Sequence, residues 1–488
     1  MEVKRMKRFI SLFLAVLMLL ATLTGCGGNG ANKDKTNGSD NIEVNTEIKG
    51  TVTVGINSYR NSDTEAVIEA FKKQYPNVEV KPIVFESTTD DATEWLTSMK
   101  MANKTIPDVI FDDAGPLPTY IQNGWVYPLT SLVKDDAEYE SVPQNVKDNF
   151  TYNDNIYALG QTLHSNALVV NEDLVEEMNV DLPEYDWTWE EFTEFIKACT
   201  NSTYSGVEDL SQVYNWVPGA MTEGCSITGY QYETNTFNLE AVRKYVNYYF
   251  EIAKLNGVEA TSLKQNASAG KSDYAKKFGD VSGTNAAFIA GKVACTFAGT
   301  WSYASWNQKD LEFNWEYYPV PQCVEGRIPI HVDYCWMTTD VKEENLEAAW
   351  TFLRYVTYSK AGNLARLTSY DEDHISEDMN QVYYMPCTTD EDVVEKFDSL
   401  PYLTDSILYI YENFENGYLG DPEKTVPGFE SVEYPIIGKL AYESVTGRDD
   451  FSSKMNDAQT KANAEIANYL KIFNEALAKF EKEFAESH

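Results

Sequence analysis

The sequence predicts a two-lobe α/β fold in which each lobe is a sheet flanked by helices and hinge crossovers join the lobes. Three observations predict it. The chain has 488 residues, which is too long for one compact core and suits two lobes. Apolar residues make up 43% and charged residues 24%, the balance of a soluble globular protein. Short β-type runs alternate with helical patterns along most of the chain, which is typical of helix-covered parallel sheets.

The N-terminus has the features of a lipoprotein signal peptide over residues 1–25. Four basic residues lie within the first eight positions, and an uncharged apolar run follows from 9 to 23. This run is short for a membrane span and has the length of a signal-peptide core. It ends in Leu23-Thr24-Gly25-Cys26, which resembles the bacterial lipobox. We therefore expect lipidation of Cys26 and a position on the extracellular face of the bacterial cytoplasmic membrane. A cleaved signal with an incidental cysteine is the alternative.

Residues 26–49 are rich in Gly, Asn, Asp and Lys, which predicts a flexible linker. No later segment approaches a spanning length, so we expect the membrane to be reached through the lipid alone. The formal net charge is −37. Nucleic acid requires a basic face and is excluded as a partner. Solubility outside a cell accounts for the acidity, and the Asp-rich loop pattern of a calcium site does not occur.

The folded part begins with a β-α-β-α-β order. Residues 51–56 form a β-rich run, and Ser62-Asp63-Thr64-Glu65 has the form of a capping box that opens a helix. A second strand is predicted at 78–85, a helix at 95–104 and a third strand at 107–111. This order predicts a parallel sheet covered by helices.

The alternation continues along the chain. The later predicted elements are a strand at 166–171, a helix opened by the capping box Thr188-Trp189-Glu190-Glu191, a strand at 293–298, a helix at 346–353 and a long helix at 457–483. The expected domains are lobe 1 at 50–163, lobe 2 at 164–328, a return to lobe 1 at 329–375 and a mainly helical part at 376–488, mostly with lobe 2.

Motifs of catalysis are lacking in the sequence. It contains no phosphate-binding glycine loop, no nucleophile elbow and no zinc-protease helix, and it has only four histidines. Besides Cys26 there are six scattered cysteines without a C-x-x-C pair, which argues against zinc and favours buried free thiols; Cys323 and Cys335 are the only close pair. We expect a protein that is not an enzyme and needs neither cofactor nor metal.

Ligands of open α/β sheets sit beyond the carboxyl ends of the strands, and two facing sheets would form a cleft there. Asp112-Asp113 follows a predicted strand. Adjacent strand residues point in opposite directions, so this pair cannot flank one glycosidic bond. Asp112 is either an acceptor for ligand hydroxyls or a solvated strand end. Trp301 follows the small residues Gly299-Thr300, which favours a stacking platform over a core position.

A series of weak motifs in a fixed order resembles the extracellular solute-binding protein family typified by maltose-binding protein. The motifs are Phe71-Lys72-Lys73-Gln74-Tyr75-Pro76, Pro107-Asp108-Val109-Ile110-Phe111, Gly124-Trp125-Val126-Tyr127-Pro128-Leu129, Asn155-Ile156-Tyr157-Ala158-Leu159, Val170-Asn171-Glu172-Asp173-Leu174, Trp187-Thr188-Trp189-Glu190-Glu191-Phe192, Ala287-Phe288-Ile289-Ala290-Gly291-Lys292-Val293-Ala294, Gly299-Thr300-Trp301, Tyr318-Pro319-Val320-Pro321 and Ala348-Ala349-Trp350-Thr351-Phe352-Leu353. The resemblance runs from about Thr51 to the mid-400s.

The resemblance implies a periplasmic-binding-protein-like fold of type II that closes around a ligand and hands it to the permease of an ABC importer, with a monomer as the expected state. Carried over by position, it implies a ligand site made of Tyr59, Glu86, Asp112, His164, Trp216, Trp301 and Asp333. The chain departs from the family pattern at Cys225, at His164 in the hinge, and at His331 and Asp333 in the crossover after Pro321.

The expected ligand is a sugar or oligosaccharide, because sugars present hydroxyl edges and apolar faces. A receptor for a polyamine or peptide is the alternative, with Glu86, Asp112 and Asp333 pairing with cations. A surface glycoside hydrolase and a sensor partner for a membrane kinase are further alternatives from other classes.

Overall fold

The computed structural model describes residues 44–58, 61–87, 91–264, 267–268, 271–302, 305–306, 309, 311–370, 384–401 and 403–487. The expected signal peptide, Cys26 and most of the linker lie outside the described residues. The part of the chain from Val44 onward forms one compact unit. Within the described part, no helix combines the length and the apolar composition that crossing a bilayer requires.

The larger sheet contains the predicted β-α-β-α-β unit. Its strands are β1 (Gly50–Asn57), β2 (Val78–Phe85), β3 (Val109–Asp113), β6 (Leu159–His164), β15 (Pro329–Met337), β16 (Met385–Pro386) and β17 (Tyr418–Leu419). Along the sheet the order is β16-β6-β15-β3-β1-β2, and β17 pairs with β15. β1 runs parallel to β2 and β3, which confirms the prediction, whereas β15 is antiparallel to both β3 and β6.

The smaller sheet has the order β14-β7-β13-β8. Its strands are β7 (Asn166–Asn171), β8 (Ser205–Val207), β13 (Val293–Gly299) and β14 (Trp315–Pro319). Ala167 and Val169 of β7 belong to one apolar cluster, and Leu168 and Val170 belong to the other. The first cluster also contains the apolar residues of the larger sheet. Because successive side chains of β7 point to opposite faces, apolar residues cover both faces of the smaller sheet.

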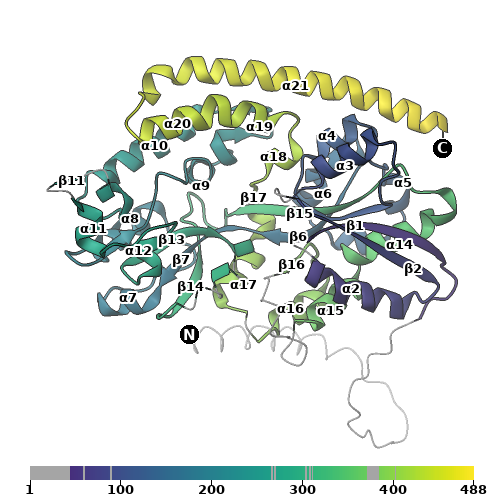
Figure 1. Ribbon diagram of the computed structural model, residues 1–488, viewed down its shortest axis with the longest axis horizontal. Coiled ribbons are helices and arrows are strands. Elements are labelled where there is room, and N and C mark those ends of the chain that lie inside the picture. The colour runs from purple at the N-terminus through teal and green to yellow at the C-terminus, as the bar shows by residue number, and fades with distance from the viewer. Residues whose placement is uncertain are drawn as a thin grey trace, which may run out of the picture. The chain divides into compact units, whose positions relative to one another are not determined.

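Helices cover both sheets, and short elements connect them (Figure 1). The helices are α2 (Asn61–Gln74), α3 (Thr93–Met101), α4 (Leu117–Gln122), α5 (Thr130–Val133), α6 (Gln144–Asn149), α7 (Glu172–Glu177), α8 (Trp189–Ala198), α9 (Val217–Met221), α10 (Leu239–Ala253), α11 (Asp273–Phe278), α12 (Ala286–Ile289), α14 (Leu346–Val356), α15 (Lys360–Thr368), α16 (Glu391–Asp398), α17 (Asp405–Glu412), α18 (Pro422–Thr425), α19 (Phe429–Val432), α20 (Lys439–Val445) and α21 (Phe451–Ser487). The short strands are β4 (Thr151–Tyr152), β5 (Asn155–Ile156), β9 (Tyr230–Gln231), β10 (Thr236–Phe237), β11 (Ala267–Ser268) and β12 (Lys271–Ser272).

Local signals set several boundaries. The capping box predicted at Thr188 is present: its hydroxyl accepts from the Glu191 amide, and the Glu191 carboxylate accepts from the Thr188 amide. The helix predicted at 95–104 ends at Met101, because Asn103 adopts a left-handed φ of 53°. The third strand extends two residues beyond its predicted end, so Asp112 and Asp113 are its last residues rather than a following loop.

Two crossovers carry the chain between the sheets. β6 and β7 are separated only by Ser165, yet they belong to different sheets; β14 and β15 are likewise consecutive strands of different sheets. The Ser165 hydroxyl donates to the Pro329 carbonyl at the start of β15 (2.7 Å), and the Ser165 amide donates to the Thr300 hydroxyl after β13 (3.0 Å). Ser165 therefore ties both crossovers together.

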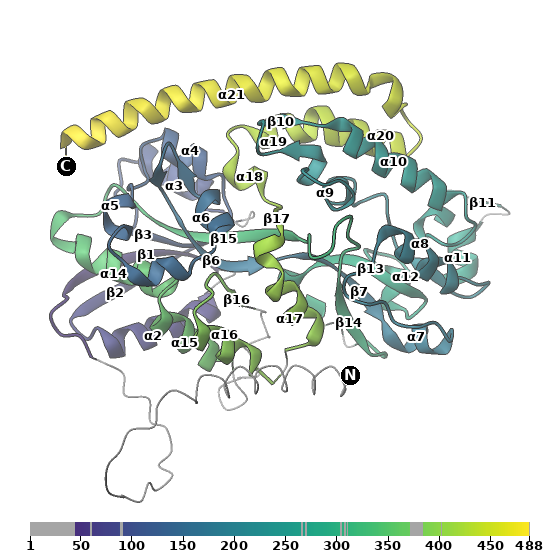
Figure 2. The same cartoon turned by 180° about the vertical axis from the view of Figure 1, so that it is seen from behind.

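α21 runs along α19, α20 and α10 and continues past α4, as Figures 1 and 2 both show. Its Ala462 and Ile466 belong to the second apolar cluster, and its Phe473 and Leu477 belong to the first. Residues of α16 and α17 also pack in the first cluster. The domain boundaries, including the assignment of 376–488 mostly to the second lobe, stay a prediction.

The six cysteines other than Cys26 are free thiols. Five are buried and Cys323 is half-buried. Cys323 and Cys335, the close pair in sequence, are not joined. Burial raises the pKa of Cys199 to about 12, so this thiol is unreactive at neutral pH. Cys199 thus acts as a small apolar side chain within the second apolar cluster.

Candidate functional site

Trp301 lies where β13 ends and the chain turns into the short helix η6 (Thr300–Ser302). Its side chain is 43% exposed, which is high for tryptophan. Gly299 makes this position possible: a Cβ there would lie 2.3 Å from the Trp301 ring. The ring therefore folds back over the strand end, against Gly299.

Among the described residues, three aromatic rings surround Trp301, and all meet it nearly at right angles. The ring centroids of His164 and Trp216 lie 6.1 Å from that of Trp301, at interplanar angles of 87° and 84°. The His331 centroid lies 5.2 Å away at 77°. Edge contacts fix a ring without covering it with a parallel partner. These edge contacts fix the orientation of the Trp301 ring, and the ring remains partly exposed to solvent.

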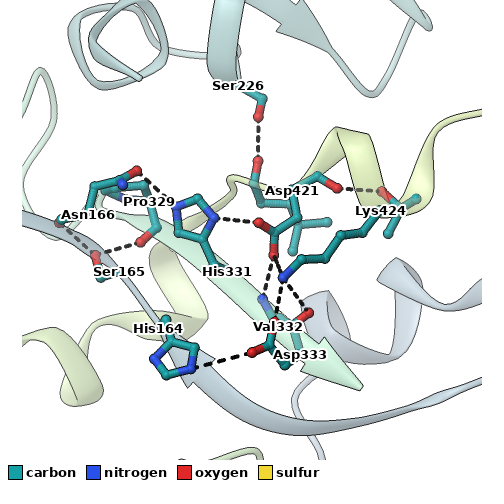
Figure 3. A network of polar contacts seen from close by, with 12 residues as sticks. His164, Ser165, Asn166, Ser226, Pro329, His331, Val332, Asp333, Asp421 and Lys424 are labelled. Carbon is teal, nitrogen blue, oxygen red and sulfur yellow. Dashed lines mark hydrogen bonds and ion pairs between the residues drawn. The ribbon is translucent and has the colours of Figure 1, made fainter. Parts of the chain in front are cut away.

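His331 is 8% exposed and uses both of its ring nitrogens. Nδ1 contacts Oδ1 of Asp421, and Nε2 lies 2.8 Å from Oδ1 of Asn166 (Figure 3). Asp421 precedes α18, and Asn166 is the first residue of β7. Gly420 packs against the His331 ring, where a Cβ would lie 2.8 Å from Cε1. His331 is thus held between the crossovers and the C-terminal segment.

Lys424 joins two buried carboxylates in the same network. Its Nζ donates to Asp333 Oδ1 at 2.6 Å and to Asp421 Oδ2 at 3.2 Å. The Val332 amide also donates to Asp421 Oδ2, at 2.6 Å. Although burial lowers the pKa of Lys424, the two carboxylates raise it above its usual value. Burial likewise opposes ionisation of Asp421, yet His331 and Lys424 hold its pKa below the usual range.

The predicted residues His164 and Asp333 belong to this network. His164 is 2% exposed and pairs with His331 across the β6–β15 ladder. Its Nε2 lies 3.6 Å from Asp333 Oδ2. Asp333 is 4% exposed and contacts Lys424. The structure therefore brings together His164, Trp216, Trp301 and Asp333 of the predicted site.

Of the other three predicted site residues, the structure describes Glu86 in full, only the backbone of Asp112, and nothing of Tyr59. Glu86 is exposed after β2, and its carboxylate accepts from the Ser58 hydroxyl at 2.9 Å. Asp112 lies in β3, and its side chain falls outside the described residues. Tyr59 falls outside them entirely. Ligand roles for all seven residues stay predictions.

Asp113, the neighbour of Asp112, is a structural residue. It is 2% exposed and accepts from Trp336 Nε1 (3.0 Å) and the Gly115 amide (2.9 Å). Burial raises its pKa to about 6, against the effect of these hydrogen bonds. Its neighbour on β15, Tyr334, is fully buried as well, so Asp113 cannot reach a solute.

Sequence reasoning noted His331 as a departure in the crossover but missed Asn166, Asp421 and Lys424. Asp421 and Lys424 come about 90 residues after their partners on β15; Asp421 directly precedes the short helix α18, and Lys424 lies within it. The one available signal was the pair His331 and Asp333, which occupy alternate positions of one strand.

Carboxylates gather near α18 and α19. Burial raises the pKa of Glu423 to about 8 and that of Glu433 to about 7, with the charges of Asp421 and Glu430 adding to the shifts. Burial also raises the pKa of Glu430, and the charge of Asp91 adds to it. Asp91 precedes α3, so carboxylates from two distant segments act on each other here. At neutral pH, Glu423 is therefore largely protonated and Glu433 partly protonated.

His331, Asp421 and Glu423 are the one group in the described part of the chain that meets the spacing of a metal site, with candidate ligand atoms within 4.8 Å of one another. The Lys424 ammonium lies 3.2 Å from Asp421 and already supplies a cation there. A divalent ion would have to displace it, so we assign no metal to this group.

A shallow groove of about 630 Å³ beside α21, near Asn235 and Asn463, contains none of the predicted site residues.

A family model for bacterial extracellular solute-binding proteins matches residues 66–371, well over half of the chain. The chain belongs to this family. The expectation drawn from the ordered motifs is thereby confirmed, and the family's members are solute-binding proteins rather than enzymes.

Solved structures of other solute-binding proteins share the fold. The sugar-binding protein MalE of Xanthomonas citri matches with a TM-score of 0.66 at 14% identity, over 87% of this chain and 99% of that one. A sugar transporter protein of Rhizobium etli in an open conformation matches at 0.63 and 15%, over 88% and 99%. An ABC substrate-binding protein of Listeria monocytogenes in complex with cycloalternan matches at 0.60 and 16%, over 86% and 100%. This solute-binding protein therefore has the expected type II periplasmic-binding-protein-like fold.

Proposed function

We propose that this protein is the lipid-anchored substrate-binding component of an ABC importer and that it captures a sugar or oligosaccharide at Trp301. The observation that carries the proposal is the geometry of Trp301, which is 43% exposed and held by three perpendicular rings. Such a ring offers a fixed apolar face to a pyranose, whose C–H face is also apolar. The relatives described as sugar-binding or in complex with a carbohydrate agree with this ligand class.

Trp301→Ala weakens binding of the cognate sugar by about tenfold or more, or about 1.4 kcal/mol, because the stacking surface is lost. The cognate sugar is found first by thermal shift with mono- and oligosaccharide panels, since a ligand of the folded state raises the melting temperature. Calorimetric titration then compares the variants. Phe250→Ala is the control, because Phe250 is an aromatic of similar exposure on α10. Equal affinity of Trp301→Ala and the unchanged protein would remove Trp301 from the site.

Lipid anchoring rests on the Leu23-Thr24-Gly25-Cys26 motif. Cys26→Ser moves the protein from the membrane fraction to the medium or the soluble fraction, because the substitution removes the only thiol to which the lipid could be joined in that motif. Fractionation followed by immunoblotting measures it, with the buried Cys295→Ser as the matched control. Retention of Cys26→Ser in salt-washed membranes would contradict the anchor.

A cationic solute, such as a polyamine or a peptide amine, is the second candidate. The acidic residues near α18 and α19 favour this candidate. Besides burial, the charge of Asp91 raises the pKa of Glu430, and the charge of Glu430 raises that of Glu433. A cation would relieve that repulsion. The same thermal-shift screen, with amine and peptide panels added, separates the two candidates: a shift with amines and none with sugars selects the second.

A further inference from the structure

The helix α21 reaches from the surroundings of the smaller sheet to those of the larger sheet. It has 37 residues and is therefore on the order of 55 Å long. Figures 1 and 2 show that it runs along α20 and α10 and then passes α4. We call the residues packed around the two sheets the smaller-sheet part and the larger-sheet part. α21 is in contact with both.

A carboxylate on α21 holds the larger-sheet part. Oε1 of Glu481 accepts from Asn155 Nδ2 at 2.8 Å and from the Tyr157 hydroxyl at 3.0 Å, and its Oε2 accepts from Asn153 Nδ2 at 2.7 Å. Hydrogen bonds to an ionised group are stronger than those between neutral groups. The β4–β5 hairpin and the residue that follows it thus supply three donors to one side chain.

Two aromatic rings on either side of Glu481 extend this attachment. Phe484 meets Tyr127 edge-on, with ring centroids 5.0 Å apart at 88°, and the Phe480 centroid lies 6.4 Å from that of Tyr157. The Tyr127 amide donates to the Met337 carbonyl of β15 at 2.8 Å. The contacts therefore lead directly to the larger sheet. We call Phe480, Glu481 and Phe484 the Glu481 anchor.

The first half of α21 is attached more deeply to the smaller-sheet part. Asn463 Oδ1 accepts from the Phe237 amide at 2.7 Å, and Gln459 Oε1 accepts from the Leu239 amide at 2.8 Å. Ile466 of the same half is 0% exposed in the second apolar cluster. The three anchor side chains are only half-buried. Separation at the anchor thus exposes less apolar surface than separation at the first half.

α21 lies on the side of the molecule where the predicted site residues are found. Both cartoon views show α21, α9 and α18 on one side of the crossover strands β6 and β15, and α16 and α17 on the other (Figures 1 and 2). Trp216 directly precedes α9, and its ring meets that of Trp301. Hinge opening on this side moves the two parts away from each other. A helix attached to both parts resists that movement.

We propose that α21 is a strap that holds the two parts together on the solute side, and that the Glu481 anchor releases the larger-sheet part when they separate. The shallower attachment at the anchor places the release there. The strap then limits how often the protein opens and how fast a solute enters or leaves. The first of these effects needs no solute, whereas the second rests on the proposed function.

The restraint on opening is tested by a distance measurement without solute. The full chain carries Cys26→Ser and Cys323→Ser, since the other five cysteines are buried. Nitroxides are attached at Lys134→Cys, just after α5, and at Asn247→Cys on α10, both exposed positions. Pulsed electron resonance then measures the separation of the two parts.

Glu481→Ala with Phe484→Ala raises the population at longer distance by about tenfold, because hydrogen bonds to a charged group are lost. Glu481→Gln shifts it in the same direction by less, and it serves if the double variant does not fold. Glu475→Ala with Ile472→Ala is the matched control, a carboxylate 70% exposed and an apolar side chain 48% exposed on the same helix. Equal distance distributions in the anchor and control variants would overturn the strap.

Release at the anchor is tested by tying it shut. Asn155→Cys and Glu481→Cys are joined by an ethylene bis-methanethiosulfonate, which a reductant removes. The control tie joins Thr51→Cys and Glu79→Cys, which pair across β1 and β2 within one sheet. Stopped-flow tryptophan emission follows binding of the panel compound with the largest thermal shift, with maltotriose tried first.

The tie across the anchor lowers both the association and the dissociation rate by about tenfold or more, and the reductant restores them. The control tie leaves both rates unchanged. Rates that are equal with and without the anchor tie would overturn release at Glu481. If no compound of any panel binds, the proposed function fails, while the solute-free distances still decide whether α21 restrains opening.

Discussion

Lys424→Met lowers the free energy of unfolding by about 3 to 5 kcal/mol, because it leaves two buried carboxylates without their ammonium partner. Asp333 and Asp421 are 4% and 2% exposed and both contact Lys424. Methionine keeps the length and the apolar stem of the side chain, so lost packing contributes little. Urea unfolding at neutral pH, monitored by circular dichroism, measures the change.

Two controls isolate the charge effect. Lys454→Met breaks an ion pair with Asp449 in which the lysine side chain is 58% exposed, and such pairs contribute at most about 1 kcal/mol. Adding Asp333→Asn to Lys424→Met removes one of the stranded charges and restores part of the loss. A Lys424→Met protein as stable as the Lys454→Met protein would show that the network carries no net charge stabilisation.

The sequence predicted most of the framework because its signals are local. The strand run at 51–56, the Thr188–Glu191 capping box and the apolar stripe from Leu346 each depend on neighbours within a few residues, and each is found as an element of the structure. The sequence predicted the ends of helices and strands less accurately than their presence. Asp112 and Asp113 were expected after a strand and instead close it, since β3 pairs with the returning strand β15 as far as Asp113.

The sequence predicted only part of the candidate site. A partly exposed Trp301 was expected because a strand end and two small residues precede it, and the structure shows the ring half-exposed; its role in ligand binding stays a prediction. The sequence did not predict the ion network. Asp421 and Lys424 are separated from His331 and Asp333 by about 90 residues in the sequence, and only folding brings them into contact. No periodicity connects such positions. Asn166 was also missed, since its place at the start of a strand says nothing about a partner on another strand.

Glu259→Gln makes the protein more stable by about 3 to 4 kcal/mol at pH 8 but by only about 1 kcal/mol at pH 5. Glu259 is 1% exposed; its Oε1 accepts from the Leu210 amide at 2.8 Å, while its Oε2 has no hydrogen-bond partner among the described residues. Burial, with the charge of Asp209 adding to it, raises the pKa of Glu259 to about 7. Glutamine resembles the protonated carboxyl in shape and carries no charge to desolvate.

The direction with pH follows from proton binding. In the unfolded chain a glutamate loses its proton near pH 4.3, whereas folded Glu259 holds its proton to about pH 7. Between these values the folded state binds more protons, so stability falls as pH rises, and it falls no further once Glu259 is ionised in both states. Urea unfolding of both proteins from pH 5 to pH 8 measures the difference, with the exposed Glu251→Gln on α10 as control. A gap between Glu259→Gln and the unchanged protein that is constant across this range would mean that Glu259 is ionised throughout, and that a partner outside the described contacts already compensates its charge.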